Sequence, residues 1–148
     1  MATAWTWASI VLLSMTPNLV LGPSAAIAVG IESHIPMAWL LPVVSFAGFV
    51  EGMAVAWLAG RSTNIGIVHR WIERMRSPRS LAFASRWGIW GGMTIGNAIA
   101  GQEPVLVALR WLDVSLRRLW LPVAFGNVLF SFIYYYTVQM GLEKLGQF

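Results

Sequence analysis

Two acidic side chains stand inside strongly apolar stretches of this 148-residue chain. Glu103 lies in TIGNAIAGQEPVLVALR, residues 94–110, and Glu51 lies in FAGFVEGMAVAW, residues 46–57. A carboxylate in apolar surroundings is costly unless it is protonated, paired or in contact with water. Glu103 can therefore exchange a proton with a substrate or bind a cationic group, and Glu51 is expected to face a cavity or the partner subunit. For Glu103 a second role, compatible with the first, is to cap free N–H groups at the start of a half-helix.

Further polar side chains in apolar surroundings complete the set of candidate substrate- or ion-binding residues. They are Asn18, Asn97, Gln102, Arg110 and Asn127. The asparagines could equally hydrogen-bond between helices, and Gln102 could satisfy backbone groups at the tip of a turn. Arg110 follows Glu103 by about two helical turns, so it could pair with Glu103 or bind an anion. Its alternative role is to extend its charged end to the membrane surface.

The residue types that most enzymatic chemistry needs are missing. The chain has no cysteine, and His34 and His69 are far apart with no second ligand near either, so we expect no metal site. It contains no glycine-rich phosphate loop, no cofactor motif and no grouping of nucleophile, base and acid. The sequence therefore predicts a protein that is not an enzyme and has no cofactor.

The composition predicts an integral protein of the cell membrane. Hydrophobic residues make up 57% of the chain, charged residues only 11%, and the mean hydropathy is +0.66, whereas soluble proteins carry about 25% charged residues. The arginines behind the net charge of +4 flank apolar segments, which argues against a nucleic-acid partner. No Lys or Arg precedes the first apolar run, so we expect that run to belong to the mature protein. Membrane lipids are the expected surroundings.

The apolar segments are of two kinds. Residues 36–60 and 119–141 are uninterrupted, whereas residues 5–31 and 89–109 are broken by proline and glycine. The breaks predict hairpin turns at Pro17–Pro23 and at Gly101–Pro104. At about 20 residues per span, the chain is too short for most self-contained transport pathways, so we expect a homodimer.

Arginine placement favours two full spans and two re-entrant hairpins over four simple spans. Segments 61–88 and 110–118 are both rich in arginine, and the positive-inside rule places both in the cytoplasm. The apolar segment between them, 89–109, must then enter and leave on one side. Residues 5–34 have no Lys or Arg and are expected to enter and leave on the outer side.

An internal repeat supports this arrangement. Asn18–Gly22 (NLVLG) aligns with Asn97–Gly101 (NAIAG), and Leu41–Val43 aligns with Leu121–Val123 (LPV in both) at an offset that is longer by one position. The predicted fold is an all-α membrane domain of two repeats with inverted topology, each a re-entrant hairpin followed by a transmembrane helix.

The expected boundaries divide one membrane domain into three segments. They are repeat 1 at 1–60, a basic surface connector at 61–88 and repeat 2 at 89–148. Within the connector, the spacing of apolar residues in IGIVHRWIERM predicts a short amphipathic surface helix over residues 65–76.

The stretches LLSMTPNLVLGPSAAIAVGI and RWGIWGGMTIGNAIAGQEPVLVALRWLDVSLRRLWLPVAFGN carry a family resemblance. Their layout of broken hairpin, basic stretch and final span resembles the small multi-drug export protein family. That family is similar in plan to the DedA/SNARE-associated Golgi proteins, which have paired re-entrant hairpins and move lipids or lipid-linked carriers. This chain departs from the family at Asn18–Gly22, where the family's first hairpin usually carries an acidic and a basic residue.

We therefore expect a small membrane transporter with its substrate site where the hairpin tips meet. The substrate would be a small amphipathic molecule or a lipid, with protons coupled through Glu103 or Glu51. The alternative is a non-transporting membrane subunit that docks a partner or anionic lipid through the basic amphipathic segment.

Overall fold

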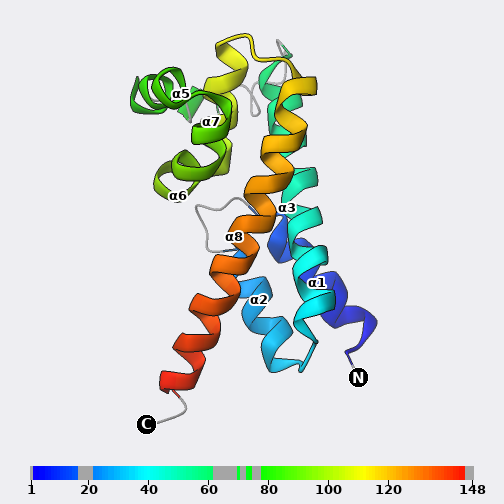
Figure 1. The fold of residues 1–148 in the computed structure, drawn as a ribbon. Helices are drawn as coiled ribbons and strands as arrows, with labels where there is room; N and C mark the ends of the chain where they lie inside the picture. The colour runs from blue at the N-terminus through cyan, green and yellow to red at the C-terminus, as the bar shows by residue number, and fades with distance from the viewer. Residues whose placement is uncertain (1, 17–21, 62–69, 71–72, 75–77, 146–148) are drawn as a thin grey trace. The chain divides into compact units, whose positions relative to one another are not determined.

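The computed structural model describes residues 2–16, 22–61, 70, 73–74 and 78–145, and every regular element among them is helical (Figure 1). The all-α fold predicted from the sequence is confirmed. The chain forms two compact units: Met1–Val50 with Asn127–Phe148, and Glu51–Gly126. Each unit thus contains one part of each of the two longest helices.

These two helices are long and apolar enough to cross a membrane. They are α3, Met37–Ala59, and α8, Leu116–Leu145. At 1.5 Å per residue even α3, with 23 residues, extends about 34 Å, against about 30 Å for the hydrocarbon core of a bilayer. The prediction of two uninterrupted apolar spans is confirmed to this extent. The helix α8 begins earlier and ends later than predicted.

In the first unit, α1 (Ala4–Ser14) and α2 (Gly22–Glu32) pack against each other. The Thr3 hydroxyl caps α1 by accepting from the Thr6 amide at 3.2 Å. Their apolar faces form one core with the first part of α3 and with tyrosines of α8. Its buried members are Ile10, Ala26, Ile27, Ile35, Leu40 and Val44. The turn predicted at Pro17–Pro23 falls mainly on residues outside the described part of the chain.

In the second unit the chain reverses at Gly101. Helix α5 (Pro78–Gly91), a π-helical turn η2 (Gly92–Gly96) and the short α6 (Asn97–Ala100) lead to this reversal, and α7 (Gln102–Trp111) packs back against all three. Gly101 has φ 84° and ψ 162°, a backbone conformation available essentially only to glycine.

The predicted turn at Gly101–Pro104 was too wide. Only Gly101 leaves the helical conformation, and Gln102 is already the first residue of α7. Proline is compatible with a position this early because the first N–H groups of a helix have no intrahelical partner. Gln102 thus stands directly after the reversal at Gly101, as the first helical residue of α7.

The helices α2 and α7 end in the same hydrogen-bonded motif. Each end has a residue with positive φ, His34 at 54° and Asp113 at 57°. In each, two amides donate back across the helix end as in a Schellman motif: His34 N to Ile31 O and Ile35 N to Gly30 O in the first, Asp113 N to Arg110 O and Val114 N to Leu109 O in the second. The next helices, α3 and α8, begin at Met37 and Leu116, equally far beyond His34 and Asp113.

Four pairs of buried residues in the two segments have the same separation in sequence as His34 and Asp113. The pairs are Ala26 and Val105, Ile27 and Leu106, Leu40 and Leu119, and Val44 and Val123, all at most 3% exposed. The LPV match of the sequence is one position out of register with these pairs, so its prolines are not equivalent in the two segments. Each repeated segment runs helix, Schellman end and long helix, which gives the repeat seen in the sequence a counterpart in local structure.

The connector differs from expectation in one respect. Most of the predicted amphipathic helix, residues 65–76, lies outside the described residues, and within it only Arg70, Glu73 and Arg74 are described, all exposed. Helix α5 begins at Pro78, inside the segment assigned to the connector. Proline at the first position of a helix has a fixed φ that suits the helix.

Candidate functional site

The structure joins two of the predicted site residues by a direct hydrogen bond. The Gln102 side-chain amide donates from Nε2 to Oε2 of Glu51 at 3.0 Å. Gln102 is fully buried, and Glu51 is half-buried within α3. The bond therefore links the start of α7 to the middle of a candidate membrane span.

A glycine on α3 makes this contact possible. A Cβ added at Gly52 would overlap Nε2 of Gln102 and would lie 2.9 Å from its Cδ and 3.2 Å from Cγ1 of Val123. Any side chain at position 52 would thus displace the amide that reaches Glu51. Sequence analysis missed Gly52, although its separation of four residues from Gly48 is the small-xxx-small pattern of closely packed membrane helices.

Glu103 is fully buried in the first turn of α7. Its Oε2 lies close to Gly101, since a Cβ built on that glycine would be 3.3 Å from it. The partial positive charge of a helix N-terminus favours a carboxylate here. Glu103 also lies close enough to Glu51 for their carboxyl groups to interact electrostatically. The site thus holds two acidic groups and one amide donor.

Asn97 lies in the same hairpin, on α6 at the end of the π-helical turn. It is 5% exposed, and its Oδ1 accepts no hydrogen bond from any described residue. Single π-helical turns inside α-helices occur frequently at functional sites. Asn97 is therefore a buried acceptor within the helix that leads to the Gly101 reversal.

Arg110 has a structural arrangement that the sequence did not predict. Its Nε donates to Ala56 O at 3.1 Å and its Nη1 to Val114 O at 2.6 Å, and its guanidinium packs on Gly60. These bonds fasten the end of α7 to the end of α3, where the helix dipole favours a cation. The guanidinium is thus bonded to backbone carbonyls, and not to Glu103 as the sequence spacing had suggested.

Two candidates remain. Asn127 belongs to the first unit, where its Oδ1 fills the space beside Gly48. Asn18 lies outside the described residues. Within the second unit, the structure brings together Glu51, Gln102 and Glu103.

The arrangement favours protons and cations over anions. The Glu51 carboxyl group is largely buried, and the groups that act on it are the Glu103 carboxyl group and the Gln102 amide. No cationic side chain in the described part of the chain contributes to its surroundings. Across those same residues, no cluster of three or more His, Cys, Asp or Glu side chains could hold a metal ion. A single positive charge, or a proton, is the ligand that two adjacent carboxyl groups accommodate best.

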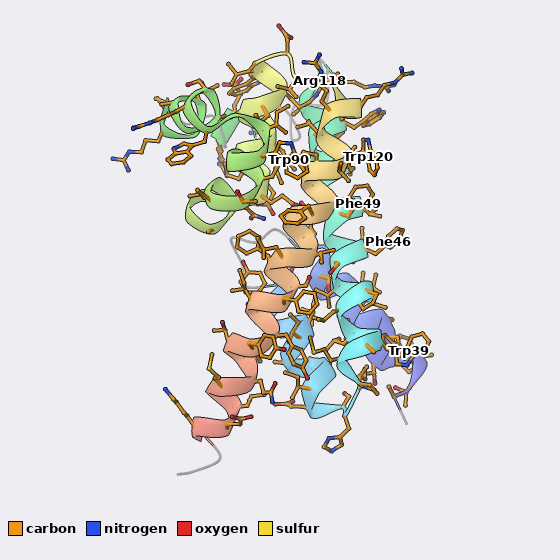
Figure 2. The ribbon with its side chains drawn as sticks, viewed as in Figure 1. Trp39, Phe46, Phe49, Trp90, Arg118 and Trp120 are labelled. Atoms are coloured by element: carbon orange, nitrogen blue, oxygen red, sulfur yellow. The ribbon has the colours of Figure 1, made fainter. Side chains whose placement is uncertain are left out.

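Large aromatic side chains lie along α3, α5 and α8. Figure 2 shows Trp39, Phe46 and Phe49 on α3, and Trp90 and Trp120 in the second unit. Trp90 meets Phe125 edge to face at 5.9 Å between ring centroids. Large exposed apolar side chains on helices of this length fit contact with lipid.

Comparison with known protein families, with curated proteins and with solved structures finds no match for this chain.

Proposed function

We propose that this protein is a small membrane transporter that exchanges protons for a cationic amphipathic molecule at Glu51, Gln102 and Glu103. The observation that carries the proposal is the hydrogen bond between Gln102 and Glu51, with buried Glu103 beside it. Acidic groups within candidate membrane helices are costly and characteristically serve ion or substrate pathways. An amine-bearing drug and the amine head group of a lipid present the same chemistry to this site.

The proposed exchange is balanced in charge. When the cation binds, one carboxyl group releases its proton to water and the resulting carboxylate pairs with the cation. When the cation leaves, the same oxygen takes a proton back, so the apolar surroundings do not hold an uncompensated charge. Gln102 donates to Glu51 and holds that carboxyl group in one orientation.

The proposed topology follows the sequence expectation: two full spans, two re-entrant hairpins and cytoplasmic arginine-rich segments at 61–88 and 110–118. It is supported by the repeat of α2 and α7 with their following helices at one constant offset. Inverted-repeat transporters place the substrate site near the bilayer midplane between the repeats. A second copy of the chain would complete the pathway, since two long helices are too few to enclose one.

Flux through vesicles tests the transport proposal. The purified protein is reconstituted into liposomes with an imposed pH gradient, and uptake of a fluorescent lipophilic cation is compared with gradient-driven movement of an amine-headed fluorescent lipid. We expect Glu51→Gln and Glu103→Gln each to abolish proton-driven flux of one of these probes. The exposed carboxyl of Glu143 provides the control, since Glu143→Gln should transport like the parent chain. Flux that persists in both buried variants, or that is absent in the parent chain for both probes, would contradict the proposal.

Cysteine labelling tests the hairpins separately. The chain has no cysteine of its own, so single cysteines at Ser33, Ser85 and Ser115 report unambiguously. Ser85 and Ser115 are exposed on either side of the second hairpin. We expect both to react from the cytoplasmic face and Ser33 from the opposite face. Reaction of Ser85 and Ser115 from opposite faces would exclude a re-entrant second hairpin.

A further inference from the structure

An apolar groove runs along α1 and α3 in the first unit. Its volume is about 540 Å³. Its lining is entirely apolar and consists of Val11, Met15, Trp39, Pro42, Val43, Phe46, Ala47 and Val50. A groove of this lining on a candidate membrane helix is a place for hydrocarbon.

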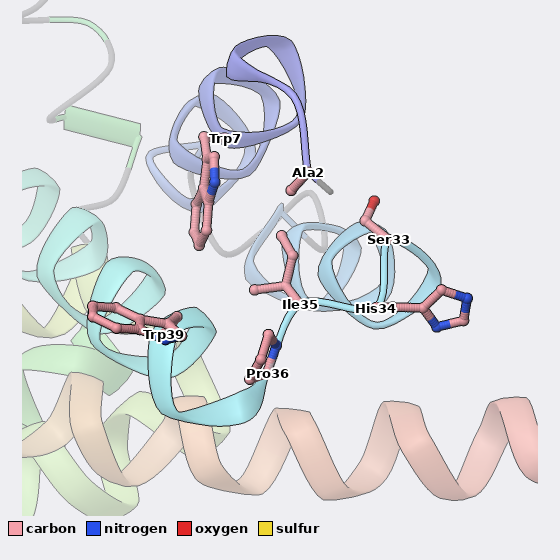
Figure 3. A pocket seen from close by; sticks show the side chains of 7 residues that line it. All are labelled: Ala2, Trp7, Ser33, His34, Ile35, Pro36 and Trp39. Carbon is pink, nitrogen blue, oxygen red and sulfur yellow. The ribbon is translucent and has the colours of Figure 1, made fainter.

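A second, smaller pocket of about 400 Å³ adjoins the groove through a shared wall, the side chain of Trp39. Unlike the groove, it lies at the end of the helices, where Ser33, His34, Ile35 and Pro36 connect α2 to α3. Figure 3 shows Trp7 of α1 and Trp39 of α3 to one side of Ile35, with His34 directed outward on the other side. Among the lining side chains, the indoles of Trp7 and Trp39, the Ser33 hydroxyl and the His34 imidazole carry hydrogen-bond donors.

We propose that the groove and the pocket together bind one phospholipid without net charge, its acyl chain in the groove and its head group in the pocket. The proposal goes beyond the transport function and holds whether or not the protein transports. Tryptophans gather where membrane meets water because the ring is apolar and its N–H is polar. Trp39 is 69% exposed at the junction of the two spaces, which places the junction at the head-group level.

The length of the groove fits one leaflet. From Trp39 to Val50 the helix advances eleven residues, or about 16 Å at 1.5 Å per residue, and half of the hydrocarbon core is about 15 Å. An acyl chain of one leaflet therefore matches the groove in length.

The charges around the pocket decide the kind of head group. No Lys or Arg occurs in the sequence before Arg61, so the side chains of residues 1–60 include no guanidinium or ammonium group that could hold an anionic phosphate. Glu32, at the end of α2 and next to Ser33, is exposed and acidic. A zwitterionic head group offers its phosphate to the neutral donors and its amine toward the carboxylate, whereas an anionic lipid gains nothing from Glu32.

The test counts the lipids that remain bound to the full-length protein. The protein is reconstituted into vesicles of equal parts phosphatidylethanolamine and phosphatidylglycerol, extracted in mild detergent and examined by native mass spectrometry. We expect one phosphatidylethanolamine per chain. Val11→Trp fills the groove and should lower this occupancy about tenfold, whereas Leu12→Trp, on the neighbouring exposed position that does not line the groove, should leave it unchanged.

A second pair of variants probes the junction without filling the groove. Trp39→Leu should lower occupancy, and Trp5→Leu, exposed and outside both linings, should not. Helical content by circular dichroism confirms that each variant is folded. Equal loss in both members of a pair, retention in Val11→Trp, or preference for phosphatidylglycerol would overturn the proposal. Loss of a dimer in Val11→Trp with lipid retained would instead show that a second copy covers the groove, and would also overturn it.

Discussion

Replacing Gly52 with alanine should destabilise the protein, although alanine is the better helix former. In an unconstrained helix the change from glycine to alanine stabilises by about 0.8–1.0 kcal/mol. At position 52, however, the added Cβ would overlap the Gln102 amide, which would have to leave Glu51. Loss of a hydrogen bond to a carboxyl group and exposure of buried polar groups to apolar surroundings cost about 1.5–3 kcal/mol. The balance is a net loss of about 0.5–2 kcal/mol.

Equilibrium unfolding in mixed micelles, followed by circular dichroism, measures this balance. Gly141 is the matched control because it is exposed on α8 and a Cβ there would meet nothing within 4 Å. Gly141→Ala should therefore stabilise, with the opposite sign to Gly52→Ala. In a double-mutant cycle with Gln102→Ala, the Gly52→Ala penalty should largely disappear, because its cause has been removed. If Gly52→Ala stabilises as much as Gly141→Ala, the contact between Gly52 and Gln102 does not have the role assigned to it.

Two further predictions concern the ends of α7. Gly101 and Gly88 both have positive φ in regions open essentially to glycine, so alanine at either should cost about 1–3 kcal/mol in unfolding free energy. Only Gly101→Ala also crowds Glu103, and it alone should impair transport in the vesicle assay; equal impairment by Gly88→Ala would show that strain is the cause. Arg110→Lys should cost about 1–2 kcal/mol because an ammonium cannot reproduce two bonds to separate carbonyls. The same change at exposed Arg118 should stay within about 0.5 kcal/mol, and a similar effect at both would refute the structural role of Arg110.

The long helices and the second hairpin were predictable because their signals are local. Uninterrupted apolar runs of sufficient length predicted α3 and α8, and the glycine and proline near position 101 predicted a reversal there. The repeat was visible as two short matches, and its basis in the Schellman ends of α2 and α7 appeared only with the hydrogen bonds. Those ends have His34 and Asp113 at positive φ, positions that sequence patterns assign to glycine more readily.

The composition of the site was less predictable because it depends on packing between distant segments. Nothing in the sequence pairs Glu51 with Gln102, and their bond requires a glycine at position 52. Arg110 illustrates the same limit. Its spacing from Glu103 along α7 indicated an ion pair, whereas its partners are the carbonyl of Ala56 in α3 and the carbonyl of Val114 in the loop after α7. Helical periodicity shows which residues lie on the same face of a helix. It does not show which other segment of the chain packs against that face.

Proton release on cation binding tests the central claim most directly. The purified protein in weakly buffered detergent solution is titrated with a lipophilic cation while the pH is recorded, so that no flux or vesicle is needed. If Glu51 and Glu103 exchange protons for the cation, the parent chain should release protons in proportion to the cation bound, and the variant with both residues changed to glutamine should release none. Proton release of the same size from the double variant, or cation binding without proton release in the parent chain, would contradict the account.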